Sequence, residues 1–167
     1  VRIVRLLHGI GWDYQVVRSR QMHEYRCQIT RVVDGDTVDV DIDLGFGVWM
    51  RKQRVRLYGV DTPESRTRDL EEKEFGMMAK KYVKGHLPIG TDQILRTHKD
   101  GKGKFGRILG EFVVEMAEGM TTLNALLIKN HHAVEYTGQS KESIAEEHLI
   151  NRGLLRLSKT ASDMEKI

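Results

Sequence analysis

Side chains able to do chemistry are concentrated between Arg54 and Glu64, where the chain reads Arg-Val-Arg-Leu-Tyr-Gly-Val-Asp-Thr-Pro-Glu. The first part alternates polar and apolar residues, which predicts a half-buried strand with Arg56 on its polar face. Asp61 and Thr62 follow at a proline, which disfavours helix in the residue before it and so predicts a turn. An arginine and two carboxylates beside a core cost free energy unless a bound ion completes the group. This stretch therefore predicts an ionic site.

Asp36 and Arg107 lie in two other predicted turns and could join this site. Asp36 ends an Asp-Gly-Asp turn, and Arg107 follows Lys-Phe-Gly. Two carboxylates with a main-chain or hydroxyl oxygen form an oxygen-only donor set, which suits Ca²⁺ or Mg²⁺ and not zinc. Two arginines on separate strands can each present a planar fork to one phosphate, and Glu64 can then direct a water molecule. The combination indicates metal-assisted attack on a phosphodiester.

Each of these motifs has a simpler structural interpretation when it is taken alone. Residues 34–37 are typical of a hairpin turn, and residues 61–64 are typical of a helix N-terminus with a cap, a proline and an acid. Arg56 alone would be a surface strand residue, and Arg107 a loop charge. Their occurrence together favours the functional interpretation.

Two further groups of side chains could be interpreted as metal sites. The first combines histidines with one acid: His131, His132, Glu135 and His148. Its spacing is not that of a zinc-binding helix, and we expect a polar connector instead. The second group is a row of alternate acids: Asp39, Asp41 and Asp43. For these acids we expect a solvated strand face and not a second metal site.

The elements that must position these residues follow from hydrophobic periodicity. Strands are expected at residues 25–33, 37–44, 48–60, 93–97 and 107–114. Helices are expected at residues 71–86, 121–129 and 140–155, the second with a threonine cap. Five short strands with a long central hairpin favour a small closed β-barrel with about three α-helices, which is an α+β fold. A five-stranded OB-fold barrel fits best, and an open α+β sheet is the alternative.

Composition limits the class of protein. The 167 residues are 40% hydrophobic and 31% charged, as in a soluble globular domain, and no apolar run approaches the ~18 residues of a membrane span. The net charge of +3 is carried by residues 1–21, so attraction to a polyanion has to be local. Cys27 is the only cysteine, which excludes an internal disulfide.

We expect one domain over residues 22–157. Residues 1–21 are expected to be a disordered or non-native extension, and residues 158–167 a frayed tail. Arginines interrupt the apolar pieces of residues 1–21, so no signal peptide is predicted there. The cytoplasm, or release on cell lysis, is the expected location, and the sequence does not decide between them.

Three blocks of the chain resemble the signature of thermonucleases, the staphylococcal nuclease-like family. These blocks are residues 33–38 (Val-Asp-Gly-Asp-Thr-Val), 56–64 (Arg-Leu to Val-Asp-Thr-Pro-Glu) and 105–107 (Phe-Gly-Arg). The likeness covers residues 24–152 in family order and is most similar to short members encoded by bacteriophages. It implies the OB-fold barrel and hydrolysis of DNA and RNA with little sequence specificity, giving 3′-phosphate ends. We expect a monomer without a membrane partner.

The resemblance also implies roles for the acidic residues. Asp36 and Asp61 would bind Ca²⁺ through their carboxylates, and Thr62 would bind it through its main-chain carbonyl. Asp34 would lie beside the metal ligands. Glu64 would act as the general base that orients the attacking water.

The remaining roles concern the substrate. Arg56 and Arg107 would bind the scissile phosphate and stabilise the charge that develops on its oxygens. Lys104 would contact a flanking phosphate, and the ring of Tyr136 would stack on a base. Phe105 stands where family members often have a tyrosine, and the hairpin between residues 36 and 56 is longer than usual.

Two other functions remain open. A non-catalytic nucleic-acid- or peptide-binding module is the main alternative, because degenerate copies of this fold bind without cleaving. Such copies lose the acids or arginines, and all of them are present here, which favours the enzyme. A phosphodiesterase acting on small nucleotides could use the same site.

Overall fold

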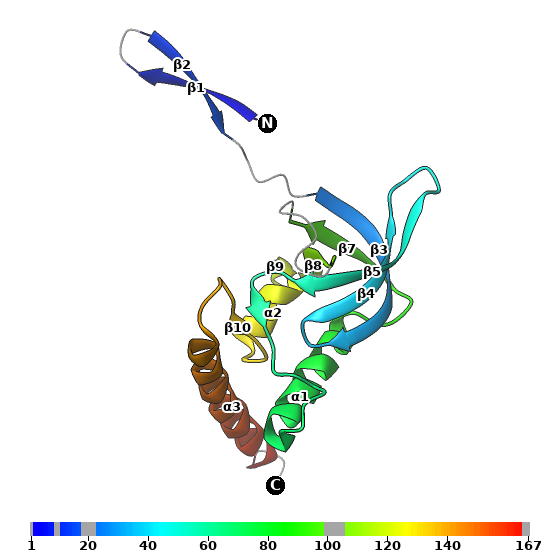
Figure 1. The fold of residues 1–167 in the computed structure, drawn as a ribbon, viewed down its shortest axis with the longest axis vertical. Coiled ribbons are helices and arrows are strands. Elements are labelled where there is room, and N and C mark those ends of the chain that lie inside the picture. The colour runs from blue at the N-terminus through cyan, green and yellow to red at the C-terminus, as the bar shows by residue number, and fades with distance from the viewer. Residues whose placement is uncertain (1, 9–10, 18–22, 99–105, 165–167) are drawn as a thin grey trace.

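The computed structural model describes residues 2–8, 11–17, 23–98 and 106–164 (Figure 1). The strands in these ranges are β1 (Arg2–His8), β2 (Gly11–Val17), β3 (His23–Asp34), β4 (Thr37–Asp43), β5 (Trp49–Leu57), β6 (Val60–Asp61), β7 (Asp92–Thr97), β8 (Ile108–Met116), β9 (Gly119–Thr122) and β10 (Val134–Glu135). The helices are α1 (Leu70–His86), α2 (Leu123–Lys129) and α3 (Lys141–Met164).

Five strands close into a barrel. The order β5-β4-β3-β7-β8 is antiparallel throughout, and a parallel pairing of β5 with β8 joins the two ends of the sheet. Strand β9 extends β8 beyond this ring. The closed ring of strands has the connectivity of an OB-like barrel. The predicted fold is therefore confirmed, and the open sheet is not formed.

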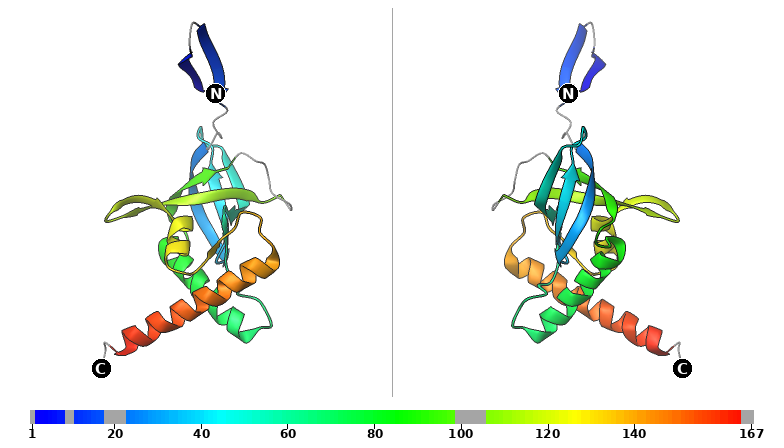
Figure 2. Two further views of the ribbon diagram at one scale, coloured as in Figure 1. Left: turned by 90° about the vertical axis from the view of Figure 1, so that its left-hand side faces the viewer. Right: turned by 90° about the vertical axis from the view of Figure 1, so that its right-hand side faces the viewer.

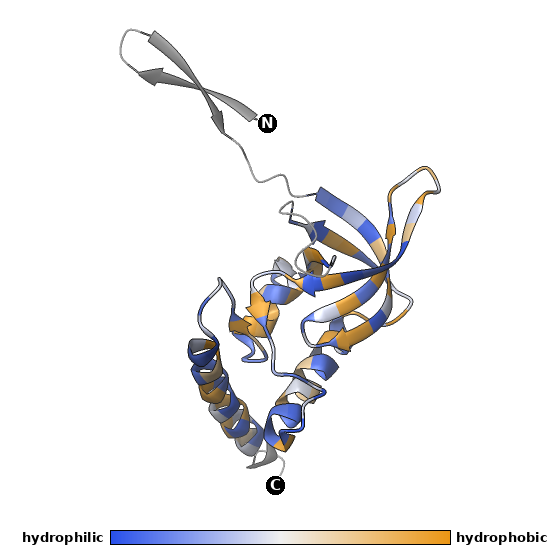
Figure 3. Cartoon of the chain, in the orientation of Figure 1, coloured by the Kyte–Doolittle hydropathy of each residue, from blue (hydrophilic) through white to orange (hydrophobic). Residues whose placement is uncertain are grey.

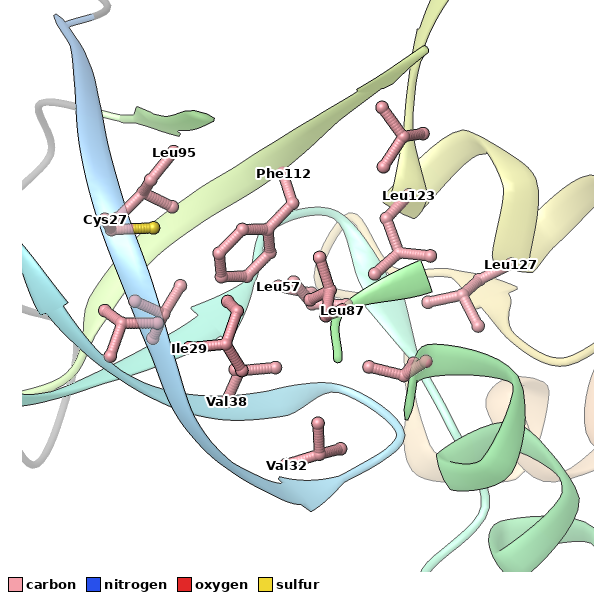
Figure 4. Packing of buried hydrophobic residues seen from close by; sticks show 14 of the residues in the cluster. Cys27, Ile29, Val32, Val38, Leu57, Leu87, Leu95, Phe112, Leu123 and Leu127 are labelled. Atoms are coloured by element: carbon pink, nitrogen blue, oxygen red, sulfur yellow. The ribbon is translucent and has the colours of Figure 1, made fainter. Parts of the chain in front are cut away.

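The barrel interior is filled by the inward face of each strand. Alternate residues of β4 are fully buried, as the sequence pattern predicts, and they pack with β-branched and aromatic residues of β3, β5 and β8 (Figure 4). Phe112 and Leu57 are among the largest side chains with almost no exposure. The alternation of apolar and polar residues along these strands is visible in Figure 3.

The polar face of β4 is covered by ion pairs. Asp39 pairs with Arg54, Asp41 with Arg51 and Asp43 with Arg26, at 2.7, 2.8 and 2.6 Å respectively. The solvated strand face expected for these acids is thus a ladder of arginine–carboxylate pairs along one side of the barrel.

The helices lie at one end of the barrel, where α1 and α3 cross in both side views (Figure 2). Helix α1 begins after Asp69, whose side chain accepts hydrogen bonds from the amides of Glu71 and Glu72. Arg156 of α3 pairs with Glu71 at 2.7 Å and so ties the later part of α3 to the start of α1.

Several boundaries differ from the predictions. The predicted strand 48–60 is interrupted at Gly59, whose positive φ of 71° turns the chain so that β6 pairs with β10. Strand β9 occupies residues 119–122, so α2 begins after Thr122 instead of at residue 121. Helix α3 runs on to Met164, through most of the segment predicted to be frayed.

Strands β1 (Arg2–His8) and β2 (Gly11–Val17) pair with each other in antiparallel orientation. We predicted no regular structure there, because arginines interrupt its apolar residues, and the cross-strand pairing was not apparent from that pattern. Whether the domain needs this segment stays a prediction. Within the described residues, no helix is both long and apolar enough to cross a membrane.

Candidate active site

Asp36 lies in the tight turn between β3 and β4, at one end of the barrel. Asp36 is only 5% exposed. Its side-chain Oδ1 accepts a hydrogen bond from Thr37 Oγ1 at 2.8 Å, and its main-chain carbonyl accepts one from Leu57 N at 2.8 Å. The neighbouring Asp34 accepts a hydrogen bond from Gly35 N. These contacts fix the turn against the end of β5, which carries Arg56.

Arg56 joins the two acids that the sequence assigns to one site. Its Nη1 donates to Asp36 Oδ2, and its Nη2 donates to Asp61 Oδ1 at 2.8 Å. The Arg56 side chain is 20% exposed, so this pairing is partly shielded from water. An acid from the β3–β4 turn and an acid from strand β6 therefore meet on one guanidinium.

Asp61 has a second partner, His148, which comes from helix α3 far along the chain. His148 Nε2 lies 3.0 Å from Asp61 Oδ2, and the His148 side chain is 9% exposed. Burial alone would raise the pKa of Asp61, but hydrogen bonds from His148 and Arg56 outweigh it, so the pKa lies below its ordinary value. No spacing rule links these positions, because 87 residues separate them.

The histidines that follow α2 and that lie on α3 have different surroundings. The ring of His132 packs on Tyr82 with centroids 4.6 Å apart, and burial lowers the pKa of His132. Among residues 23–98 and 106–161, whose side chains the structure describes, no three His, Cys, Asp or Glu side chains are grouped to hold a metal ion.

Glu64 follows Pro63 in the irregular connection between β6 and α1 and not in a helix, because α1 starts only at Leu70. The interpretation of residues 61–64 as a helix N-terminus is therefore wrong. Glu64 is exposed taken as a whole, but its carboxylate is partly buried. This burial raises the pKa of Glu64, and the nearby negative charge of Asp34 raises it further. A carboxylate with a raised pKa is a better proton acceptor than a free one.

The charged groups face two hollows that meet at the arginines. One, of about 380 Å³, is lined by Asp34, Asp36, Arg56, Glu64 and Arg107 among others. The second, of about 730 Å³, is also lined by Arg56 and Arg107, together with Asp61 and Tyr136. Arg56 and Arg107 thus both line each of the two hollows.

The Tyr136 side chain borders the second hollow and is partly exposed, so a planar ligand could reach its ring. Lys104 and Phe105, the other positions singled out on this side, lie outside the described residues.

The donor atoms available to a cation here are oxygens. Thr62 is 5% exposed, and its Oγ1 is buried without a hydrogen-bond partner in the described part of the chain. Asp36 and Asp61 both pair with Arg56, and after burial the charges of Asp34 and Asp61 contribute to the raised pKa of Glu64. Carboxylate oxygens and main-chain carbonyls, such as those of Asp36, Asp61 and Thr62, are the kind of donor that a hard divalent cation prefers.

Comparisons with known proteins identify the family. The model of the staphylococcal nuclease homologue family matches residues 54–161, a range that contains Arg56, Asp61, Glu64 and Arg107. The chain is 29% identical over 118 residues to endonuclease YhcR of Bacillus subtilis, covering 68% of this chain and 9% of that protein. It is 39% identical over 83 residues to the thermonuclease of Staphylococcus intermedius (48% of this chain, 44% of that protein).

The thermonuclease of Staphylococcus hyicus is 35% identical over 89 residues, covering 52% of this chain and 47% of that protein. The chain spans less than half the length of each of these three curated relatives. The family match nevertheless covers well over half of the present chain and includes most of the ionic site. The chain belongs to the staphylococcal nuclease homologue family.

Proposed function

We propose that the protein is a metal-dependent nuclease that hydrolyses phosphodiester bonds of DNA and RNA. The observation that carries this proposal is the meeting of Asp36 and Asp61 on the Arg56 guanidinium, at hollows that Arg56 shares with Arg107. Carboxylates and guanidinium groups around one space are what binding a cation beside a phosphate requires.

Ca²⁺ is the proposed cation, with the carboxylates of Asp36 and Asp61 and the main-chain carbonyl of Thr62 as its protein ligands. Because only two side chains would bind it, water and a substrate oxygen would complete its coordination. When bound, a divalent cation polarises the phosphoryl group and lowers the negative charge that an attacking water meets.

The protein's own residues supply the other parts of the reaction. Arg56 and Arg107 hold the phosphate from two sides and stabilise the charge that grows on its oxygens. Glu64 accepts the proton of the attacking water and is suited to this by its raised pKa. Tyr136 stacks on a base next to the scissile bond, and Lys104 contacts a flanking phosphate.

Contacts of this kind go to phosphate, cation and ring faces, which carry little sequence information. We therefore propose low sequence specificity, cleavage of both DNA and RNA, and products with 3′-phosphate ends. We propose a monomer as the active form, because all assigned residues come from one chain.

The proposal is tested with plasmid DNA in the presence of Ca²⁺ or a chelator. Arg107→Ala and Glu64→Gln should each reduce turnover by about 10²-fold. Arg51→Ala is the control, because Arg51 pairs with Asp41 on the outer face of β4 and β5. Parent protein that binds DNA but does not cut it under any divalent cation would support the non-catalytic binding module instead.

A dinucleotide substrate separates the remaining alternative. A nuclease should cleave long DNA with a far higher kcat/KM than a dinucleotide, because flanking phosphates add binding energy. A preference for the small substrate would identify a phosphodiesterase of small nucleotides.

A further inference from the structure

Helix α1 touches the main chain at Glu64, and it does so through Gly76. A Cβ atom placed on Gly76 would lie 2.6 Å from the carbonyl carbon and oxygen of Glu64 and from the nitrogen of Ser65. No real Cβ approaches main-chain atoms so closely. The helix can therefore lie at this distance only because residue 76 has no side chain.

A glycine inside a helix is unfavourable, so the helix itself does not account for Gly76. Glycine loses more backbone freedom than alanine on folding, and position 76 is buried in the middle of α1. The contact with Glu64 and Ser65 gives this position its physical explanation.

The same face of α1 also touches the turn that carries Asp36. A Cβ atom on Gly35 would lie 2.9 Å from Ala79 Cβ and 2.8 Å from Thr62 Oγ1. Positions 76 and 79 are neighbours on one helix face, because residues three apart lie side by side. One face of α1 is thus in contact with both turns of the ionic site.

We propose that Gly76 is a positioning residue, which sets the place of the Glu64 carboxylate relative to Asp36 and Asp61. Gly76 does this by letting α1 support the Glu64–Ser65 peptide directly. The inference rests on the role of Glu64 in the proposed function.

Gly76→Ala should displace this peptide and leave the barrel intact. The added methyl group meets main-chain atoms at 2.6 Å, so helix and turn must separate to reach ordinary contact distances. Displacements of about 1 Å near a reacting group can lower a rate by about 10²-fold. We expect a 10- to 100-fold lower kcat, with KM changed less than about threefold.

Gly85→Ala is the matched control. Gly85 lies in the same helix, and a Cβ atom there meets nothing within 4 Å. Its replacement tests the effect of exchanging a helical glycine without the contact, and it should leave both kcat and KM at the parent values.

A double-mutant cycle with Glu64→Gln decides whether Gly76 acts through Glu64. If it does, Gly76→Ala lowers kcat by about 10- to 100-fold in the parent, but by less than about threefold in a protein that already carries Glu64→Gln. Equal losses in the two backgrounds would overturn the inference and leave the proposed nuclease intact. Parent-like activity of Glu64→Gln alone would instead refute the role of Glu64, and the inference with it.

Amide chemical shifts provide a readout that does not depend on activity. In ¹⁵N-labelled Gly76→Ala the largest changes outside α1 should fall on the amides of Glu64 and Ser65, and in Gly85→Ala these two amides should not move. If Gly76→Ala unfolds in dilute buffer, both measurements are made in trimethylamine N-oxide, which favours the folded state. A chain that stays unfolded there would contradict the inference, because the contact would then serve the fold as a whole.

Discussion

His148 Nε2 lies 3.0 Å from Asp61 Oδ2, and this contact ties helix α3 to strand β6. The other oxygen of Asp61 accepts a hydrogen bond from Arg56, so both carboxylate oxygens have a partner. A carboxylate held at both oxygens keeps one orientation. In the proposed site Asp61 binds the cation, and replacing a residue that orients a metal ligand typically lowers metal affinity by about 10- to 100-fold.

His148→Ala should therefore weaken Ca²⁺ binding by about 10-fold or more, because Asp61 would lose the partner that orients it. Calorimetric titration with Ca²⁺ measures the affinity, and digestion of plasmid DNA gives the matching change in activity. His23→Ala, at an exposed position on β3, is the control and should behave like the parent. Equal Ca²⁺ affinity in both variants would show that the His148 contact has no part in cation binding.

Arg56→Ala should lower the free energy of unfolding by about 2–3 kcal/mol when divalent cations are absent. The reason is that two shielded carboxylates, Asp36 and Asp61, would lose their shared positive partner. Urea unfolding with a chelator measures this loss, and added Ca²⁺ should restore part of it.

Arg54→Ala is the control for this measurement. Arg54 pairs with Asp39 on the same strand, but its side chain is half exposed, and such pairs contribute at most about 1 kcal/mol. Equal destabilisation by the two substitutions, or no response of Arg56→Ala to Ca²⁺, would contradict the ionic arrangement described for the site.

Glu64→Gln should raise the Tm at neutral pH in the absence of divalent cations while it abolishes most activity. The pKa of Glu64 is higher in the folded protein than in the unfolded chain, which means that folding disfavours the ionised carboxylate. A neutral amide of the same shape removes this unfavourable term. Thermal unfolding at pH 7 and at pH 4 tests the direction of this effect. The increase in Tm should be smaller at pH 4, where the Glu64 carboxyl of the parent is protonated. An equal increase in Tm at both pH values would contradict the raised pKa of Glu64.

Cys27 should be unreactive toward alkylating reagents in the folded protein and react fully after unfolding in urea. Its side chain is fully buried, and desolvation raises the pKa of its thiol to about 12. Because the unfolded chain releases the thiol proton near its ordinary pKa of about 9, the stability linked to Cys27 is present below pH 9 and is lost as the pH rises toward 12. Iodoacetamide labelling followed by mass spectrometry, at pH 8 with and without urea, measures the reactivity; rapid labelling of the folded chain would contradict the burial of Cys27.

The barrel strands could be predicted because their pattern is local. Val38, Val40 and Ile42 alternate with acids, and this period specifies a half-buried strand whatever surrounds it. The closure of the ring between β5 and β8 left no such signal, since it pairs segments far apart in the chain. The number and order of the elements, together with the family resemblance, predict the OB-type arrangement.

The candidate site shows the same division. Asp36, Arg56 and Asp61 stood out because charged residues and turn signals occurred together beside predicted strands. Their meeting on one guanidinium, and the approach of His148, depend on packing across the whole fold. Gly76 carried no visible signal either, because its importance comes from the Glu64 main chain behind it.

Calorimetric titration of the parent and of Asp61→Asn with Ca²⁺, each with and without a short DNA oligonucleotide, measures whether the ionic site holds a divalent cation beside a phosphate backbone. We expect one Ca²⁺ per chain in the parent, tighter Ca²⁺ binding when DNA is present, and loss of both effects in Asp61→Asn. Unchanged Ca²⁺ binding in Asp61→Asn, or DNA cleavage by a parent protein that binds no divalent cation, would contradict this expectation.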